Sequence, residues 1–155
     1  MTSSSDMPDS PTSDPIRIAV IGYGYWGPNL VRNFSGLDDC VVTAVCDLEI
    51  EKAEAYSEEF GVPAYASYRD MFRDLPDIDV AAVITPSGMH AEHGMEMITE
   101  YAKHVIMEKP TFMRPGQLTE AYSAADSAGL VIYSHYTRQP LRINFDLKDA
   151  RKLLC

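Results

Sequence analysis

Short apolar runs alternate with amphipathic segments along most of the chain. The apolar runs are rich in β-branched residues and are expected as buried strands, at 16–22, 41–47, 62–67, 79–86, 104–110 and 130–136. Between them, apolar residues three and four positions apart predict helices from Gly27–Pro28 onward and at 49–61, 68–75, 89–102 and 115–128. Because strands that are apolar throughout are covered on both faces, the expected fold class is α/β, a doubly wound parallel sheet in three α/β/α layers.

Composition separates the two ends of the chain from this alternating part. Residues 1–15 are rich in Ser, Asp and Pro and have few apolar residues to bury, so a disordered tail is expected there. One domain is expected over residues 16–140, and the start of a further helix over residues 141–155. The chain shows no basic start with an apolar stretch and no run of roughly 20 apolar residues, so neither a secretory signal nor a membrane span is expected.

Charge and cysteine usage narrow the expected partners and location. The chain carries 13 Lys and Arg against 23 Asp and Glu, a formal net charge of −10. Such a surface repels phosphates, so neither nucleic acid nor an anionic membrane is an expected partner. Cys40, Cys46 and Cys155 form no CxxC pair, and the first two lie in or beside an apolar run. These features favour a reducing compartment, and a cytoplasmic location is expected.

A glycine-rich sequence lies between the first expected strand and the first expected helix, Gly22-Tyr23-Gly24-Tyr25-Trp26-Gly27. A GxGxxG in this place, with Asp47 20 residues after the last glycine, is the fingerprint of a dinucleotide-binding, Rossmann-type domain. Gly22 is expected to permit a tight turn, Gly24 a close approach of the backbone to a pyrophosphate, and Gly27 close packing of helix and strand. Free amides at the helix start would then hold the phosphates.

Side chains in and after this loop have candidate roles of their own. Asp47 can accept hydrogen bonds from the adenine ribose hydroxyls, or it can cap the helix that begins near Glu49. The glycines favour the ribose role, and a carboxylate there would repel a 2′-phosphate, so NAD is expected rather than NADP. Tyr23, Tyr25 and Trp26 are candidate cofactor-binding residues; the last two are equally expected to pack in the core or to cover the phosphates.

Two further groups of side chains follow later strands. Glu108, Lys109 and Pro110 end the fifth strand. Because ligands of such sheets bind beyond the carboxyl ends of the strands, Glu108 and Lys109 are candidate cofactor-binding residues and Lys109 is the candidate catalytic residue. Its ammonium would polarise a substrate oxygen, or the side chain would shift its pKa and relay a proton beside the nicotinamide; the alternative is a surface lysine in a turn.

The fourth strand ends in Thr85, Pro86 and Ser87, with His90 and His93 soon after. Ser87 is a candidate cap for the helix that contains His90, and Thr85 is either a site residue or a plain end of the strand. The two histidines are three residues apart, but no third ligand accompanies them, so no metal site is expected.

The stretches IAVIGYGYWGPNLVRNF, ITPSGMHAEHGMEMI and KHVIMEKPTF resemble the glucose-fructose oxidoreductase / inositol dehydrogenase / MocA family, over residues 16 to about 135. The resemblance implies the NAD(P)-binding domain of an oxidoreductase that transfers hydride between nicotinamide and a sugar, cyclitol or related polyol. It implies that Lys109 helps to position substrate and nicotinamide. It further implies that Thr85, Pro86 and His90 form a wall of the cofactor and substrate pocket.

Two departures from the family pattern lead to further expectations. The family has a second α/β domain with its usual catalytic histidine and oligomer interface, whereas this sequence ends inside the helix that would lead there. The chain is therefore expected to be monomeric and poorly active alone, although full-length members are expected as homo-oligomers. Ala102 stands where the family usually has Gly, and in a left-handed conformation it would cost about 1 kcal/mol.

A non-catalytic NAD-binding sensor or regulatory subunit is the alternative function, since the fold alone does not fix chemistry. Lys109 distinguishes the two, because a sensor has no need of a lysine beside the nicotinamide.

Overall fold

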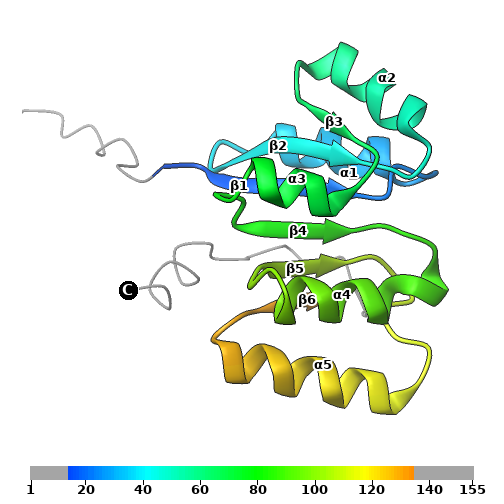
Figure 1. Ribbon diagram of the computed structural model, residues 1–155, viewed down its shortest axis with the longest axis vertical. Helices are drawn as coiled ribbons and strands as arrows, with labels where there is room; N and C mark the ends of the chain where they lie inside the picture. Colours follow the sequence, from blue (N-terminus) through cyan, green and yellow to red (C-terminus); the bar gives the residue numbers. More distant parts are fainter. Residues whose placement is uncertain (1–13, 135–155) are drawn as a thin grey trace, which may run out of the picture.

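The computed structural model of the chain describes residues 14–134, and a parallel sheet forms its centre (Figure 1). Its strands are β1 (Ile16–Ile21), β2 (Cys40–Cys46), β3 (Ala64–Tyr65), β4 (Val80–Val83), β5 (His104–Met107) and β6 (Ile132–Ser134). They lie in the order β3-β2-β1-β4-β5-β6, and every neighbouring pair is parallel. The chain therefore changes direction across the sheet between β1 and β4, which confirms the expected doubly wound, Rossmann-type topology.

Helices occupy the connections between the strands. They are α1 (Gly27–Ser35), α2 (Ile50–Phe60), α3 (Tyr68–Asp74), α4 (His90–Thr99) and α5 (Pro115–Ala128), with a 3₁₀ turn, η1 (Ser87–Met89), before α4. Every element that the sequence predicts within these residues is present. Except for β2, the strands are shorter than predicted. The expected strand 79–86, for example, is paired only over Val80–Val83, because the residues after it leave the sheet to form a turn.

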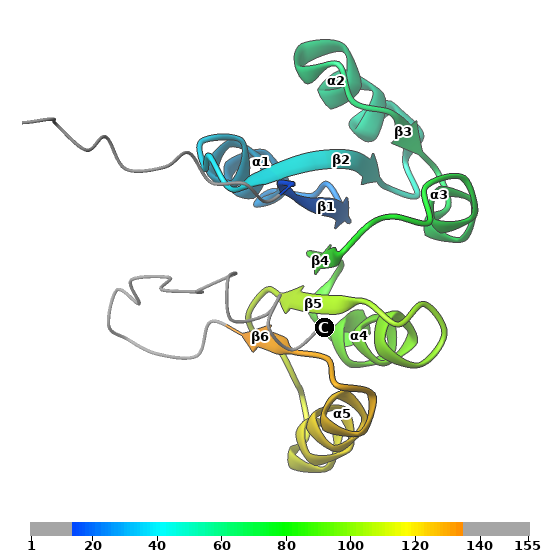
Figure 2. The same ribbon diagram turned by 90° about the vertical axis from the view of Figure 1, so that its left-hand side faces the viewer.

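Two apolar cores lie on opposite faces of the sheet. On one face, α3, α4 and α5 bury side chains such as Met71, Met97 and Ala121 against alternate residues of the strands. On the other face, α1 and α2 bury Val31 and Tyr56 against the remaining strand residues. Figure 2 shows α1 on one side of the sheet and α3 and α4 on the other. The predicted three-layer arrangement is thereby confirmed.

Residues in the left-handed conformation follow three of the helices. Gly61 and Gly129 end α2 and α5 in the left-handed conformation, with φ of 70° and 66°, as their positions predict. Ala102, between α4 and β5, is also left-handed, with a φ of 51°. The chain therefore places an alanine where its Cβ is strained.

The predicted tail over residues 1–15 and the helix over residues 141–155 lie, except for residues 14 and 15, outside the described residues. None of the helices within residues 14–134 is both long and apolar enough to cross a membrane.

Candidate functional site

A cavity of about 590 Å³ opens at the carboxyl ends of β1 to β4. It therefore lies where the strand order reverses, which is where open α/β sheets bind ligands. Six of the residues singled out from the sequence line it: Gly22, Gly24, Tyr25, Asp47, Thr85 and Pro86. The remaining ones, Tyr23, Trp26, Gly27, His90, Glu108 and Lys109, do not.

The three glycines of the loop after β1 have different structural reasons. Gly22 has a φ of +90°, and a Cβ there would lie 2.8 Å from the main chain of Ile84 and Thr85, so the loop can pass β4 only with glycine. Gly24 would carry a Cβ with nothing within 4 Å, although it lines the cavity. A Cβ on Gly27 would lie 2.8 Å from the ring of Tyr23, so this glycine makes room for the loop's own tyrosine. The atoms that such a Cβ would meet first belong to the Tyr23 side chain rather than to a strand.

The start of α1 presents free main-chain donors. Within residues 14–134, the amides of Gly24, Tyr25 and Trp26 make no hydrogen bond, and Pro28 has no amide hydrogen. The side chains of Tyr25 and Trp26 are 87% and 50% exposed and meet edge to face, 5.2 Å apart. Neither packs in the core, so of the two alternatives for this pair the core is excluded.

The Asp47 carboxylate binds the main chain of two segments, the glycine-rich loop and the turn before α2. Its Oδ2 accepts the amide hydrogen of Tyr23 at 2.6 Å, and its Oδ1 accepts that of Glu49 at 2.9 Å. Because Glu49 itself is the N-cap residue of α2, Asp47 lies too early to cap that helix. The carboxylate instead ties the glycine-rich loop to the end of β2, and each oxygen keeps a lone pair for a ligand.

Tyr23 serves the loop with its ring as well as its amide. The ring packs 5.4 Å from that of Tyr56 in α2, and burial raises its pKa. This tyrosine therefore anchors the loop from outside the cavity.

His93 and Tyr68 form the inner wall of the cavity, although the sequence indicates neither as a ligand-binding residue. His93 Nδ1 lies 2.9 Å from Thr85 Oγ1, and its ring meets the edge of the Tyr68 ring at 5.7 Å. Burial lowers the pKa of His93. The position of His93 one turn into α4, which follows β4 at the binding edge, was the only sequence signal for this role.

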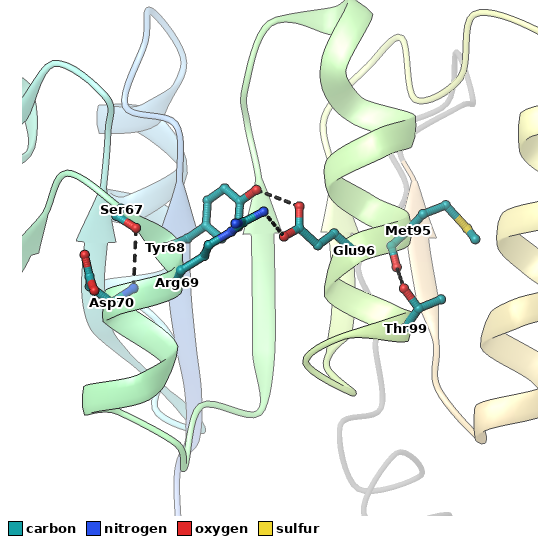
Figure 3. A network of polar contacts seen from close by, with 7 residues as sticks. All are labelled: Ser67, Tyr68, Arg69, Asp70, Met95, Glu96 and Thr99. Atoms are coloured by element: carbon teal, nitrogen blue, oxygen red, sulfur yellow. Dashed lines mark hydrogen bonds and ion pairs between the residues drawn. The ribbon is translucent and has the colours of Figure 1, made fainter.

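Glu96 joins α3 to α4 behind this wall. Figure 3 shows Tyr68 and Arg69 reaching from α3 across β4 to the same carboxylate on α4. The Tyr68 hydroxyl donates to Oε2 at 2.6 Å, and Arg69 donates to Oε1 at 3.2 Å. Burial and the neighbouring Glu96 raise the pKa of Tyr68 to about 12, so this hydroxyl keeps its proton at neutral pH.

His90 lies behind the cavity, with 1% of its surface exposed. Its Nδ1 lies 2.8 Å from the carbonyl oxygen of Pro110, and its Nε2 lies 2.5 Å from that of Thr85. A neutral imidazole donates from one nitrogen and a protonated one from both, so the ring links the turns after β4 and β5. Ser87 caps neither η1 nor α4 with its side chain, so the capping role considered for it is wrong.

The turn after β5 carries the remaining candidates. Lys109 is exposed and Glu108 half-buried, and both follow the carboxyl end of β5. Among residues 14–134, no group of three or more His, Cys, Asp or Glu side chains could hold a metal ion.

Known proteins with similar sequences are oxidoreductases and related enzymes. D-glucoside 3-dehydrogenase of Escherichia coli is 31% identical over 127 residues, which cover 81% of this chain and 36% of that protein. A glycosyl hydrolase family 109 protein of Streptomyces coelicolor is 30% identical over 122 residues, covering 72% of this chain and 25% of its own length. The chain thus spans well under half the length of these relatives.

Solved structures agree. The WlbA dehydrogenase of Chromobacterium violaceum, in complex with NADH and UDP-GlcNAcA, matches with a TM-score of 0.73 and 30% identity over 83% of this chain and 38% of its own. A NAD-binding protein of Listeria innocua matches with a TM-score of 0.72 and 29% identity, over 79% and 35% of the two chains. Residues 16–136 match the GFO_IDH_MocA family, described as "Oxidoreductase family, NAD-binding Rossmann fold". The chain belongs to this oxidoreductase family and carries its NAD-binding Rossmann fold.

Proposed function

We propose that the chain binds NAD in the cavity described above, as the cofactor-binding part of an oxidoreductase acting on a sugar, cyclitol or related polyol. The observation that carries this proposal is the loop after β1, which leaves three main-chain amides free at the start of α1 and lines a cavity of about 590 Å³. Amides at a helix start bind phosphate oxygens well, because they are unpaired donors at the positive end of the helix. Gly24 leaves room for the pyrophosphate.

Asp47 is proposed to select NAD over NADP. Each of its oxygens already accepts one main-chain amide hydrogen, so the carboxylate is fixed at the cavity floor and its remaining lone pairs can accept ribose hydroxyls. A 2′-phosphate would meet this negative charge. Lys52 also lines the cavity, but its ammonium is held 2.7 Å from Glu49 Oε1, which offsets its attraction for a phosphate.

Lys109 is proposed to act on the substrate. When bound, NAD supplies the hydride acceptor, and the substrate hydroxyl must then lose its proton. An exposed lysine at the carboxyl end of β5 can hold the substrate oxygen through its ammonium, and in its neutral amine form it can accept that proton. The names of the relatives, which include D-glucoside 3-dehydrogenase, support a sugar or polyol as substrate. Cys40 and Cys46 are free, buried thiols, which supports the proposed reducing, cytoplasmic location.

Calorimetric titration of the purified chain tests the proposal. NAD should bind more tightly than NADP, and Gly24→Val should abolish binding while circular dichroism stays unchanged, because the new side chain enters the cavity and not the core. Gly116→Val is the matched control, since its Cβ also meets nothing within 4 Å but Gly116 lies at the start of α5. Equal losses in both variants would contradict the site.

A fusion to the second domain of a relative tests Lys109. In that fusion, Lys109→Ala should lower kcat by about 10²–10⁴-fold with little change in NAD affinity. An unchanged kcat would favour a sensor or regulatory function over catalysis.

A further inference from the structure

The inner wall of the cavity holds a ring nitrogen that the proposed phosphate, ribose and hydride roles leave unused. His93 is 8% exposed and lines the cavity. Within residues 14–134 its ring makes one hydrogen bond, from Nδ1 to Thr85 Oγ1 at 2.9 Å, and Nε2 has no partner. The side chain is well buried and lines the cavity, so this nitrogen is available to a ligand there.

The ring is also held in place from behind. Tyr68 packs its ring against that of His93 at 5.7 Å, and the Tyr68 hydroxyl is fixed by Glu96 at 2.6 Å (Figure 3). Because burial lowers the pKa of His93, the ring is neutral at neutral pH. A neutral ring carries one hydrogen, and the Thr85 hydroxyl can either accept that hydrogen from Nδ1 or donate its own to Nδ1. In the arrangement in which Nδ1–H donates to Thr85 Oγ1, Nε2 is an acceptor.

Two apolar side chains in the cavity wall suit the faces of a flat ring. Leu48 is 87% exposed and Met89 36% exposed, and both line the cavity, one from the end of β2 and one from the turn after β4. Apolar side chains in such positions contact the two faces of an aromatic ring. Asp47, the residue proposed to bind the ribose, precedes Leu48 in the chain and lines the same cavity.

We propose that His93 is the base-recognition residue of this site, accepting a hydrogen bond from the 6-amino group of adenine at Nε2. The inference rests on the proposed function and extends it, because it assigns the choice of nucleobase to a particular side chain. Hypoxanthine carries a carbonyl oxygen in place of the amine, so it would bring two acceptors together and bind more weakly.

Half-molecule ligands separate this inference from the proposed function. Calorimetry on the wild-type chain should show AMP binding about tenfold more tightly than IMP, the value of one hydrogen bond. His93→Phe keeps a ring against Tyr68 but has no acceptor, so it should bind AMP and IMP within about twofold of each other. Its affinity for nicotinamide mononucleotide should not change.

His104→Phe is the matched control. His104 is 5% exposed, but it is the first residue of β5 and so lies at the amino-terminal end of the strands, away from the cavity. This variant should keep the wild-type preference for AMP. His93→Gln, which restores an amide oxygen at the wall, should recover part of the preference.

A measurement on the wild-type protein covers the case in which His93→Phe does not fold. In a long-range ¹H–¹⁵N spectrum, AMP should move the Nε2 resonance of His93 and nicotinamide mononucleotide should not. A wild-type chain that binds NAD but binds AMP and IMP equally, or leaves that resonance unmoved, overturns the inference alone. A wild-type chain that binds neither NAD nor AMP overturns the proposed function with it.

Discussion

The loop after β1 and the turns after β4 and β5 form neighbouring parts of one edge of the sheet, but they are built differently. The loop is shaped by glycines and by main-chain amides, one of which Asp47 binds. The two turns are joined by a buried side chain, His90, that contacts the carbonyl oxygens of Thr85 and Pro110. The glycine-rich loop leaves main-chain donors free for a ligand, whereas the His90 ring uses both of its nitrogens to hold the two turns together.

The largest effect is expected where the loop passes closest to β4. Gly22→Ala should lower the free energy of unfolding by about 3 kcal/mol, from a strained positive φ and a Cβ 2.8 Å from the main chain of Ile84. Urea denaturation measures it. Gly24→Ala, two residues on and free of neighbours, should stay within about 0.5 kcal/mol of wild type. Similar losses in the two variants would mean that the close approach to β4 is not what requires glycine.

This part of the site could be predicted from the sequence because its determinants are local. The spacing from Gly22 to Gly27 and the position of Asp47 at the end of β2 are properties of one βαβ unit, so they can be seen along the chain. The reason for Gly27 could not, because it depends on which way the Tyr23 ring turns.

A second effect is expected from the side-chain link. His90→Leu should cost about 2 kcal/mol of folding free energy, since it removes the ring that lies within hydrogen-bond distance of the carbonyl oxygens of Thr85 and Pro110. His93→Leu, which loses one hydrogen bond at the cavity surface, should cost about half as much. Thermal and urea unfolding of both variants test this order. Unchanged stability of His90→Leu together with lost NAD affinity would instead place His90 in contact with the cofactor.

The roles of these two histidines could not be predicted from the sequence. The resemblance implies that His90 is part of the pocket wall, and His93 is considered only as a metal ligand and rejected. The inner wall depends on three contacts between distant segments: Thr85 with His93, His93 with Tyr68, and Tyr68 with Glu96. Such contacts form only when α3 and α4 pack on the same face of the sheet, which a pattern along the chain does not specify. The element types and their order, by contrast, follow from apolar periodicity, and the structure confirms them.

Acid should lower the free energy of unfolding through two buried histidines, His93 and His104. Burial lowers the pKa of His93 at the binding edge and of His104 at the opposite edge, relative to about 6.5 in the unfolded chain. The unfolded state then binds more protons, so the stabilisation is complete above pH 6.5 and is lost as the pH falls toward the lower pKa of the folded state. Urea titrations at pH 7.5 and 5.5 measure the loss. His104→Leu should reduce this pH dependence, and an unchanged dependence would show that His104 is not its source.

The smallest effect is expected at Ala102, in the turn before β5 and away from the cavity. Ala102 is exposed and left-handed, with a φ of 51°, so Ala102→Gly should raise the free energy of unfolding by about 1 kcal/mol by relieving the strained Cβ. Ala55 is also exposed but lies inside α2, and Ala55→Gly should lower stability by about the same amount, because glycine there costs helix propensity. The same substitution should thus change the free energy of unfolding in opposite directions at two surface sites. The urea midpoints of the two variants measure both changes. NAD affinity should be unchanged in both, since neither residue lines the cavity. A fall in stability for Ala102→Gly would mean that two effects have the opposite balance. The conformational entropy that glycine adds to the unfolded chain would then outweigh the strain that it relieves in the turn before β5.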